Sequence, residues 1–333
     1  MTTLPRHSRT GAGFTLVELL VVIAVIALLA GLLIVAVGGA RRAAQDTSDQ
    51  ARLRGLAQSA TAYSADQKGR LPSPRTNTPS NWTSMKAQPS DCSGGDGGLR
   101  SELALASDPA AVKYRGWVCA DSSQCAGAID GNGTETAAAL EGGSLFSYLD
   151  SLEAYRSPMD ATGRLRSYSM NAWVGVLYAD DTVDVPAKFK GGDYATACSL
   201  AFDTRTASRI PKPSSTTLFI GDNDQAHATG SSPGWNLNGM LFNPNPQQVR
   251  AWFDLPAVWQ VGQPTMNMAF VDASTGAYRI QSDAVRNQET SQMMRGADTS
   301  SGVGISADDP SYADLVGLSR YALPGLLKAG PTE

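Results

Sequence analysis

The sequence predicts an α+β fold in which one long N-terminal α-helix precedes a head with an antiparallel β-sheet and large irregular loops. The first observation is a run of 19 residues, 19–37, drawn only from Leu, Val, Ile, Ala and Gly. The second is an amphipathic helical pattern that continues to about Gln67. The third is the rest of the chain, where short strand-like runs alternate with stretches rich in Gly, Pro, Ser and Asn.

Composition narrows the possible functions. The 333 residues include 27 basic and 31 acidic side chains, which gives a net charge of −4, and only 17% of the residues are charged, against about 25% in an average soluble domain. This mildly acidic total provides no positive field to gather nucleic acid, so we expect no nucleic-acid partner. The chain has only two histidines, His7 and His227. If the N-terminal residues that include His7 are cleaved off, one histidine remains, and a catalytic or metal site that needs two imidazoles from one chain is nearly excluded.

The apolar run is long enough to cross a membrane. At about 1.5 Å per residue it covers roughly 28 Å, close to the ~30 Å hydrocarbon thickness of a bilayer. The alternatives are a buried core helix and a cleaved secretory signal, since Arg6 and Arg9 resemble a signal's charged n-region. The run exceeds the about 7–15 apolar residues of such a signal, however, and no small-x-small cleavage site separates it from Arg41 and Arg42.

One carboxylate, that of Glu18, lies at the edge of this run, where a charge without a partner is costly. A cut between Gly13 and Phe14 would create a new α-ammonium four residues from Glu18. In a staggered assembly, the amine of one subunit could then meet the carboxylate of the next inside an apolar core, where such a pair specifies position strongly. A carboxylate in the first turn also complements the helix dipole.

The residues around this cut resemble a known signal. The stretch from Arg9 to Gly13, the block Phe14-Thr15-Leu16-Val17-Glu18 and the apolar run together resemble the class III signal of type IV prepilins and type II secretion system pseudopilins. The resemblance implies that a prepilin peptidase cleaves after Gly13 and N-methylates Phe14, which makes Glu18 the fifth mature residue. It covers about residues 6–72.

The resemblance divides the chain into four segments. These are a leader at 1–13, the transmembrane half of the N-terminal helix at 14–40, its amphipathic half at 41–69, and an extracytoplasmic α+β head at 70–333 that is similar to a pilin head.

The amphipathic half places apolar side chains on one face at helical spacing. These residues are Leu53, Leu56, Ala57, Ala60 and Tyr63. Gly69 followed by Pro72 predicts the end of the helix. Gly38 and Gly39 could loosen the helix in a filament, or could simply be small residues at a membrane edge; both interpretations stay open.

Three strand-like runs indicate the sheet of the head. They lie at residues 166–178, 216–221 and 266–280. The last run predicts a hairpin whose turn contains Asp272, Ser274 and Gly276. Residues 73–98 indicate a large irregular loop, and a C-terminal helix is predicted after residue 308, with Asp309 as the N-cap and Pro310 in the first turn.

The head is also similar to the extended heads of a broad group of bacterial pseudopilin-like proteins. Residues 213–222, Pro-Ser-Ser-Thr-Thr-Leu-Phe-Ile-Gly-Asp, are similar to their Pro-Ser-x-Thr strand with an acidic end, and residues 167–171, Ser-Tyr-Ser-Met-Asn, to their Ser-Tyr-x-x-Asn segment. The final hairpin of those heads carries Asp-Gly at its tip and often a histidine upstream. This chain has Asp272-Ala273 and no histidine nearby.

Four cysteines lie in the head: Cys92, Cys119, Cys125 and Cys198. An even number in an exported domain predicts two disulfides, with three possible connectivities. Cys119 and Cys125 are near enough in sequence to close one loop, which leaves Cys92 with Cys198. Zinc is the alternative, but no Cys-x2-Cys spacing is present.

Calcium is a weak candidate cofactor, and we expect none other. Asp130, Asn132, Thr134 and Glu141 place oxygen ligands at loop positions 1, 3, 5 and 12, as in an EF-hand. Position 6 of this loop is Glu135, where an EF-hand needs glycine. The sequence Asp-Gly-Asn-Gly is also more often a turn without a metal ion than a calcium site. Residues 222–224, Asp-Asn-Asp, form another oxygen cluster of the same weak kind.

No catalytic residue is expected, because no nucleophile elbow, Walker loop or dinucleotide fingerprint is present. His227 is more readily explained as a solvated loop residue, and the adjacent carboxylates at 180–181 and 308–309 as turn or cap residues. Three tryptophans could form a sugar-binding face, although tryptophans usually fill cores: Trp235, Trp252 and Trp259.

The expected function is therefore that of a non-enzymatic, single-pass inner-membrane subunit that later joins a filament in the periplasm or at the cell surface. Arg6 and Arg9 favour a cytoplasmic N-terminus and an extracytoplasmic head, and Arg41 and Arg42 partly oppose that orientation. The expected partners are prepilin peptidase, other pilin or pseudopilin subunits, the inner-membrane assembly platform and the lipid bilayer. The alternatives are a minor tip subunit or adhesin that binds a glycan or surface, and a membrane-anchored hydrolase; the pilus or secretion system stays open.

Overall fold

The structure of the chain, a computed structural model, describes the N-terminal helix and the packed part of the head. The described residues are 15–74, 99–100, 116–119, 125–130, 135–161, 163–175, 177–178, 202–222, 239–240, 242–243, 246, 250–252, 254–259, 263–287, 303–306 and 308–324. The chain divides into two compact units, Met1–Thr47 and Ser48–Glu333. We call the second the head unit.

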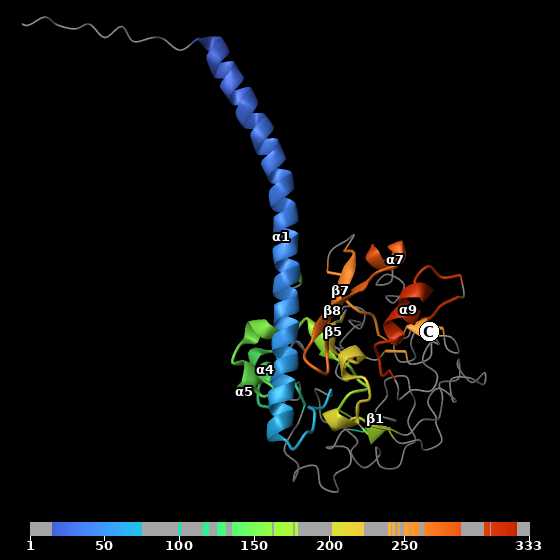
Figure 1. Ribbon diagram of the computed structural model, residues 1–333. Helices are drawn as coiled ribbons and strands as arrows, with labels where there is room; N and C mark the ends of the chain where they lie inside the picture. Colours follow the sequence, from blue (N-terminus) through green and yellow to red (C-terminus); the bar gives the residue numbers. More distant parts are fainter. Residues whose placement is uncertain are drawn as a thin grey trace, which may run out of the picture. The chain divides into compact units, whose positions relative to one another are not determined.

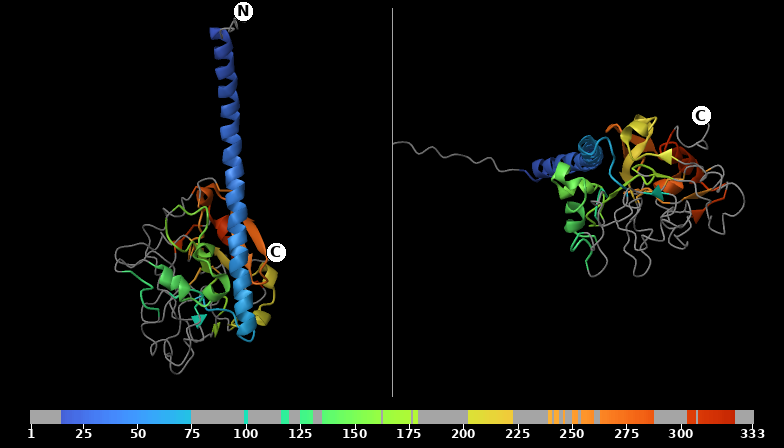
Figure 2. Two further views of the ribbon diagram at one scale, coloured as in Figure 1. Left: turned by 90° about the vertical axis from the view of Figure 1, so that its left-hand side faces the viewer. Right: turned by 90° about the horizontal axis from the view of Figure 1, so that it is seen from below.

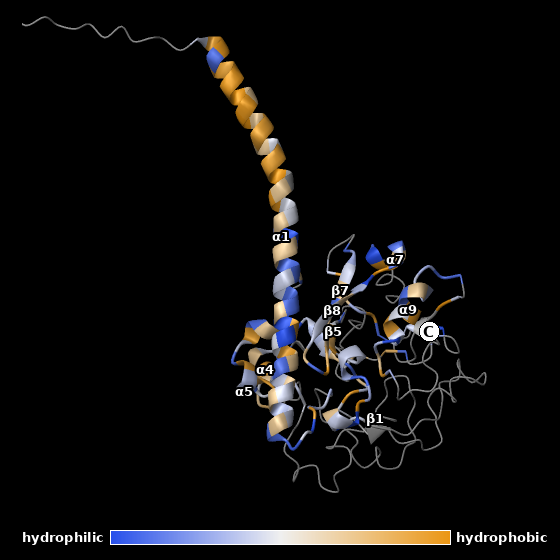
Figure 3. Cartoon of the chain, viewed as in Figure 1, coloured by the Kyte–Doolittle hydropathy of each residue, from blue (hydrophilic) through white to orange (hydrophobic). Residues whose placement is uncertain are grey.

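Helix α1 (Leu16–Asp66) is 51 residues long and passes through Gly38 and Gly39 without a break (Figure 1). Its N-terminal part is almost entirely apolar, whereas polar residues alternate with apolar ones in its C-terminal part (Figure 3). Within the described residues, α1 is the one helix that is long and apolar enough to cross a membrane, by length and composition. The long N-terminal helix predicted from the sequence is therefore confirmed.

α1 ends where the sequence predicts. Lys68 and Gly69 adopt positive φ angles of 57° and 86°, and the Gly69 N–H donates a hydrogen bond of 2.7 Å to the Ser64 carbonyl. A glycine in the left-handed region commonly closes the last helical turn, because it carries no Cβ to clash. Pro72 follows and cannot continue the helix.

A four-stranded antiparallel sheet with the strand order β2-β5-β7-β8 forms the centre of the head unit. Its strands are β2 (Tyr168–Met170), β5 (Thr217–Gly221), β7 (Thr265–Phe270) and β8 (Thr275–Arg279). β2, β5 and β8 lie within the three runs that the sequence indicates, β7 begins one residue before the last of these runs, and β7 and β8 form the predicted hairpin.

The turn of this hairpin differs from the prediction. Gly276 lies inside β8, opposite Met268, so residues 271–274 make the turn. Asp272 Oδ1 accepts hydrogen bonds from the Ser274 N–H at 2.9 Å and from its hydroxyl at 2.6 Å. Ala273 adopts a φ of 63°, a conformation that favours glycine.

Apolar side chains pack on both faces of the sheet, because successive strand residues point to opposite sides. On β7, Met266, Met268 and Phe270 join one cluster and Ala269 joins the other. The first cluster includes residues of the C-terminal helix α9, and the second includes residues of α1 and α4. The α1 residues in it are the predicted apolar face: Leu53, Leu56, Ala57, Ala60 and Tyr63. The right-hand view of Figure 2 shows the green segment that contains α4 beside the blue helix α1, and the red segment that contains α9 farther from it.

β5 breaks this alternation. Its register against β7 shifts between Thr217 and Phe219, so that Leu218 and Phe219 both join the α1 cluster while Ile220 joins the α9 cluster. A bulge of this kind places two successive side chains on one face of a sheet.

Shorter elements surround the sheet. The helices are α4 (Ala137–Glu141), α5 (Phe146–Leu149), α7 (Asp283–Arg286) and α9 (Tyr312–Ser319), and the 3-10 helices are η2 (Leu152–Tyr155), η4 (Ala207–Arg209) and η5 (Pro213–Ser215). Two small antiparallel sheets have the orders β1-β3-β4 and β6-β9, with β1 (Leu99–Arg100), β3 (Leu177–Tyr178), β4 (Phe202–Asp203), β6 (Ala251–Trp252) and β9 (Val303–Gly304).

The strand-like run at 166–178 contains two separate strands, because β2 ends at Met170 and β3 begins at Leu177. The Asn171 side chain donates hydrogen bonds to the carbonyls of Thr217 at 2.8 Å and Ala322 at 2.7 Å. These bonds hold a turn that separates β2 from β3.

The C-terminal helix is present as α9, but its predicted cap is wrong. Ser311, not Asp309, is the N-cap, and Pro310 lies in the turn before the helix. Asp309 Oδ1 accepts hydrogen bonds from the Ser311 N–H at 2.8 Å and from its hydroxyl at 2.6 Å. The Asp-Pro pair therefore forms a turn that precedes the helix.

Candidate processing and assembly site

A closed hydrogen-bond box forms the start of α1. The Thr15 N–H and hydroxyl each donate to Glu18 Oε2 at 2.8 Å, and the Glu18 N–H donates to Thr15 Oγ1 at 3.2 Å. This is a capping box, which satisfies backbone N–H groups that a helix start otherwise leaves open. The predicted processing residues, Gly13 and Phe14, lie outside the described residues.

Thr15 is a helix-capping residue that the sequence reasoning missed. Its signal was available, because Thr-x-x-Glu before an apolar run is the pattern of a capping box. The structure shows that Glu18 has a partner within its own chain before any second subunit is present.

The helix after this box carries apolar side chains that nothing in the described chain covers. Its described large apolar residues between 16 and 37 range from 46% exposed at Val22 to 81% exposed at Leu16. A contiguous exposed apolar surface of this length marks contact with a membrane or with other proteins.

A second carboxylate of α1, that of Asp49, lies at the start of the head unit and is only 2% exposed. Its Oδ1 accepts hydrogen bonds from the Ser157 hydroxyl at 2.5 Å and the Tyr168 hydroxyl at 2.6 Å, and its Oδ2 accepts one from the Asn267 amide at 3.0 Å. Burial, together with the charge of Asp49 and the hydrogen bond to it, raises the pKa of Tyr168 well above its usual range.

The sequence reasoning also missed Asp49. The helical pattern did contain a signal, because Asp49 precedes Leu53 and Leu56 at i, i+4 and i+7 and therefore shares their buried face. Neighbouring side chains add to the contact: Gln50 Nε2 donates to Asn267 Oδ1 at 3.3 Å, and Arg52 Nη1 donates to the Arg156 carbonyl at 2.6 Å. This group attaches α1 to the sheet by polar contacts.

A buried ion pair joins Arg166 to Glu135, with Arg166 Nε 3.0 Å from Glu135 Oε2. Arg166 Nη1 also donates to Ser169 Oγ at 3.3 Å, and the Ser169 hydroxyl donates to Asp222 Oδ2 at 2.7 Å. All four side chains are buried. A buried pair of this kind strongly destabilises a fold when one partner is removed.

The calcium candidate lies only partly within the described residues. Asp130 and Glu141 are described, but Asn132 and Thr134 lie outside the described residues, as do residues 223–224 of the second oxygen cluster. Ile129 and Glu135 form an antiparallel bridge. No group of three or more His, Cys, Asp or Glu side chains is placed to hold a metal ion in the part of the chain that the structure describes.

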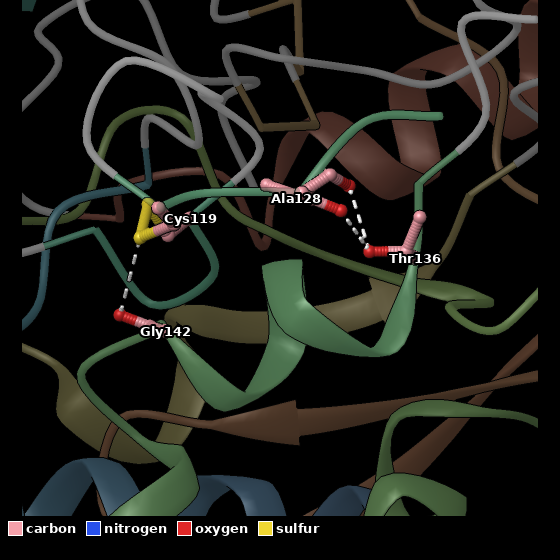
Figure 4. Close-up of a disulfide and its surroundings, with 6 residues drawn as sticks. Cys119, Ala128, Thr136 and Gly142 are labelled. Carbon is pink, nitrogen blue, oxygen red and sulfur yellow. Dashed lines mark hydrogen bonds between the residues drawn. A yellow bond between two sulfur atoms is a disulfide. The ribbon is translucent and has the colours of Figure 1, made fainter. Parts of the chain in front are cut away.

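A disulfide joins Cys119 and Cys125, with the two Cα atoms 6.3 Å apart (Figure 4). The predicted pairing of these two cysteines is confirmed, and Cys92 and Cys198 lie outside the described residues. The disulfide packs closely on the end of α4, since a Cβ at Gly142 would lie 2.6 Å from the Cys125 sulfur. It therefore fastens this loop to the helix beside it.

The predicted sugar-binding face of three tryptophans is not formed by the two that are described. Trp252 is 3% exposed and donates its indole N–H to Ser311 Oγ at 3.0 Å, so it belongs to the core. The ring of Trp259 is covered by the Arg164 guanidinium at 5.0 Å. Trp235, His227 and the carboxylates at 180–181 lie outside the described residues.

A family model described as the prokaryotic N-terminal methylation motif matches residues 9–34. No curated protein matches the chain, and no solved structure matches it. The motif implies processing by a prepilin peptidase and assembly with other pilin subunits, and the apolar part of α1 fits a single-pass membrane anchor. The N-terminal region of this chain therefore carries a prokaryotic N-terminal methylation motif and is similar to that of a type IV prepilin or pseudopilin precursor.

Proposed function

We propose that the chain is a structural, non-enzymatic subunit of a secretion pseudopilus or a type IV pilus-like filament. Prepilin peptidase cleaves it after Gly13 and methylates Phe14, and an inner-membrane assembly platform moves the subunit from the bilayer into the filament. The N-terminus begins in the cytoplasm, and the head is extracytoplasmic.

One observation carries this proposal: the methylation motif leads directly into an apolar helical surface that the rest of the described chain leaves exposed. Such a surface must be buried in lipid before assembly and against other helices after it. Packing of α1 helices from many subunits in a filament explains why the chain carries the methylation motif, and it buries the exposed apolar side chains.

The capping box supports a defined role for Glu18. The bonds from Thr15 engage Oε2, which leaves Oε1 to receive the α-ammonium of a neighbouring Phe14. In the apolar interior of a filament, this ion pair fixes the axial position of one subunit on the next, because any other register leaves two charges without partners.

The N-terminus of the native protein tests the processing step. Mass spectrometry of the chain purified from envelope membranes is expected to find N-methylated Phe14 as the first residue. A native chain that retains its first 13 residues would contradict the proposal.

Two substitutions separate the charge of Glu18 from its capping role. Glu18→Gln keeps an oxygen for Thr15 and removes the charge, so we expect normal membrane insertion and loss of incorporation into filaments. Thr15→Val keeps the charge and removes the hydroxyl, so incorporation should be weakened less. Immunoblots of membrane and sheared-filament fractions measure both steps, and normal incorporation of Glu18→Gln would refute the pairing role.

A further inference from the structure

Arg41 and Arg42 follow the apolar part of α1, and both side chains are exposed. No hydrogen bond or ion pair joins either guanidinium to another residue in the part of the chain that the structure describes. The next acidic residue, Asp46, is half-buried and lies a full turn further along the helix.

Their position along the helix corresponds to one face of a bilayer. Arg41 lies 23 residues after Glu18, which at about 1.5 Å per residue is roughly 35 Å. The hydrocarbon core of a bilayer is about 30 Å thick. When Glu18 lies at one interface, the two arginines therefore lie at the level of the lipid headgroups of the opposite leaflet.

The residues before the arginines leave space for a ligand. Helical side chains lean toward the N-terminus and cover the preceding turn, which here contains Gly38 and Gly39. A Cβ at either glycine would meet no atom within 4 Å. The guanidinium groups can thus reach back toward the bilayer surface without competition from neighbouring side chains.

We propose that Arg41 and Arg42 bind the phosphate groups of phospholipids in the leaflet on the head side, and that they select anionic phospholipids. A guanidinium presents a planar fork of N–H donors that matches phosphate oxygens. Because these cations lie on the side where positive charge opposes insertion, a bound anionic headgroup compensates them there. The inference rests on the membrane-inserted state of the proposed function, and it adds that a subunit must release these lipids when it leaves the bilayer.

Spin-labelled lipids test this selection on the full-length chain before assembly. The chain is reconstituted in phosphatidylcholine vesicles that contain a trace of spin-labelled phosphatidylglycerol or phosphatidylcholine, and electron spin resonance gives the association ratio of the two lipids. An interfacial arginine contributes roughly a fivefold preference for anionic lipid, which gives up to about 30-fold for the pair. In a background in which Arg6 and Arg9 of the leader are replaced by Gln, the ratio should fall roughly fivefold in Arg41→Gln and approach 1 in Arg41→Gln/Arg42→Gln.

Arg54 provides a matched control, because it is an exposed arginine of the same helix within the head unit. Arg54→Gln should retain the wild-type ratio. An unchanged ratio in the double variant, or an equal loss in Arg54→Gln, would overturn the inference.

The outcomes also separate this inference from the proposed function. If the wild-type chain inserts but shows no lipid preference, the inference alone fails. If it selects anionic lipid but never enters filaments, the assembly proposal alone fails. If it does not float with the vesicles at all, the membrane anchor fails, and the lipid site fails with it.

Discussion

Replacing Asp49 with Asn tests whether a buried carboxylate fastens α1 into the head unit. Asp49 accepts hydrogen bonds from Ser157, Tyr168 and Asn267. Asparagine offers one acceptor oxygen, so its NH₂ group would face the Asn267 amide, whose own oxygen already accepts from Gln50. The variant therefore loses one bond and turns the other two from charged to neutral.

The expected loss follows from the difference between these bonds. A hydrogen bond to a charged group contributes about 1.5–3 kcal/mol and a neutral one about 0.5–1.5 kcal/mol. At the middle of these ranges, one lost bond and two weakened bonds give a destabilisation of about 4.5 kcal/mol. With a urea dependence of about 3 kcal/mol/M, the unfolding midpoint should move down by about 1.5 M.

Urea unfolding of the full-length chain in detergent, followed by tryptophan fluorescence, measures this shift, because every tryptophan lies at or beyond Trp82. The matched control is Asp66→Asn. Asp66 lies on the same helix and accepts a hydrogen bond of 2.8 Å from the Tyr148 hydroxyl, but it is exposed, so its loss should be below about 0.5 kcal/mol. Equal midpoints for the two variants would refute the reasoning.

Three further predictions concern the head. Ala273→Gly should raise the free energy of unfolding by about 0.5–1 kcal/mol, because it relieves the φ of 63°; a lower urea midpoint than wild type would contradict this. The contribution of the buried tyrosines to stability should be unchanged near pH 8 and fall above about pH 10, because the folded state holds the protons that the unfolded chain releases near pH 10. Burial raises the pKa of all three of these residues: Tyr155, Tyr168 and Tyr278. Urea midpoints at pH 8, 10 and 11 measure the fall, and equal midpoints would count against it. Replacing Cys119 and Cys125 with Ala opens a loop with a sequence separation of 6 and should lower stability by about 2 kcal/mol, whereas an unchanged thermal midpoint would show that the loop is held without the disulfide.

The elements that sequence could predict are those encoded by local periodicity. The apolar run, the i, i+3, i+4 pattern through Tyr63 and the glycine before Pro72 define α1 almost to its last residue. Strand alternation around a turn defines the β7–β8 hairpin. Each of these patterns lies within a few residues of the structure that it produces, so no knowledge of distant contacts is required.

The features that sequence could not predict depend on distant partners. The donors to Asp49 are 108, 119 and 218 residues away along the chain. The helical spacing of Asp49 therefore predicts that its side chain is buried, but it does not predict which residues bind it. Asn171 ends β2 through carbonyls that come from β5 and from the segment after α9. Trp252 belongs to the core because Ser311 accepts its N–H.

Two of the carboxylates of α1, those of Asp49 and Glu18, lie in surroundings that match the different roles proposed for them. Asp49 is buried and receives three hydrogen bonds from the loop after η2, from β2 and from β7, so exchanging a partner would require the head unit to open. Among the residues that the structure describes, Glu18 is exposed and its side chain accepts hydrogen bonds from Thr15, one turn away, through a single oxygen. A new cationic partner can approach Glu18 without disturbing any packed residue. In the proposed filament, the acid that stays unchanged during assembly is thus held by distant parts of the chain, and the acid that accepts a neighbour is held, among the described residues, by its own helical turn.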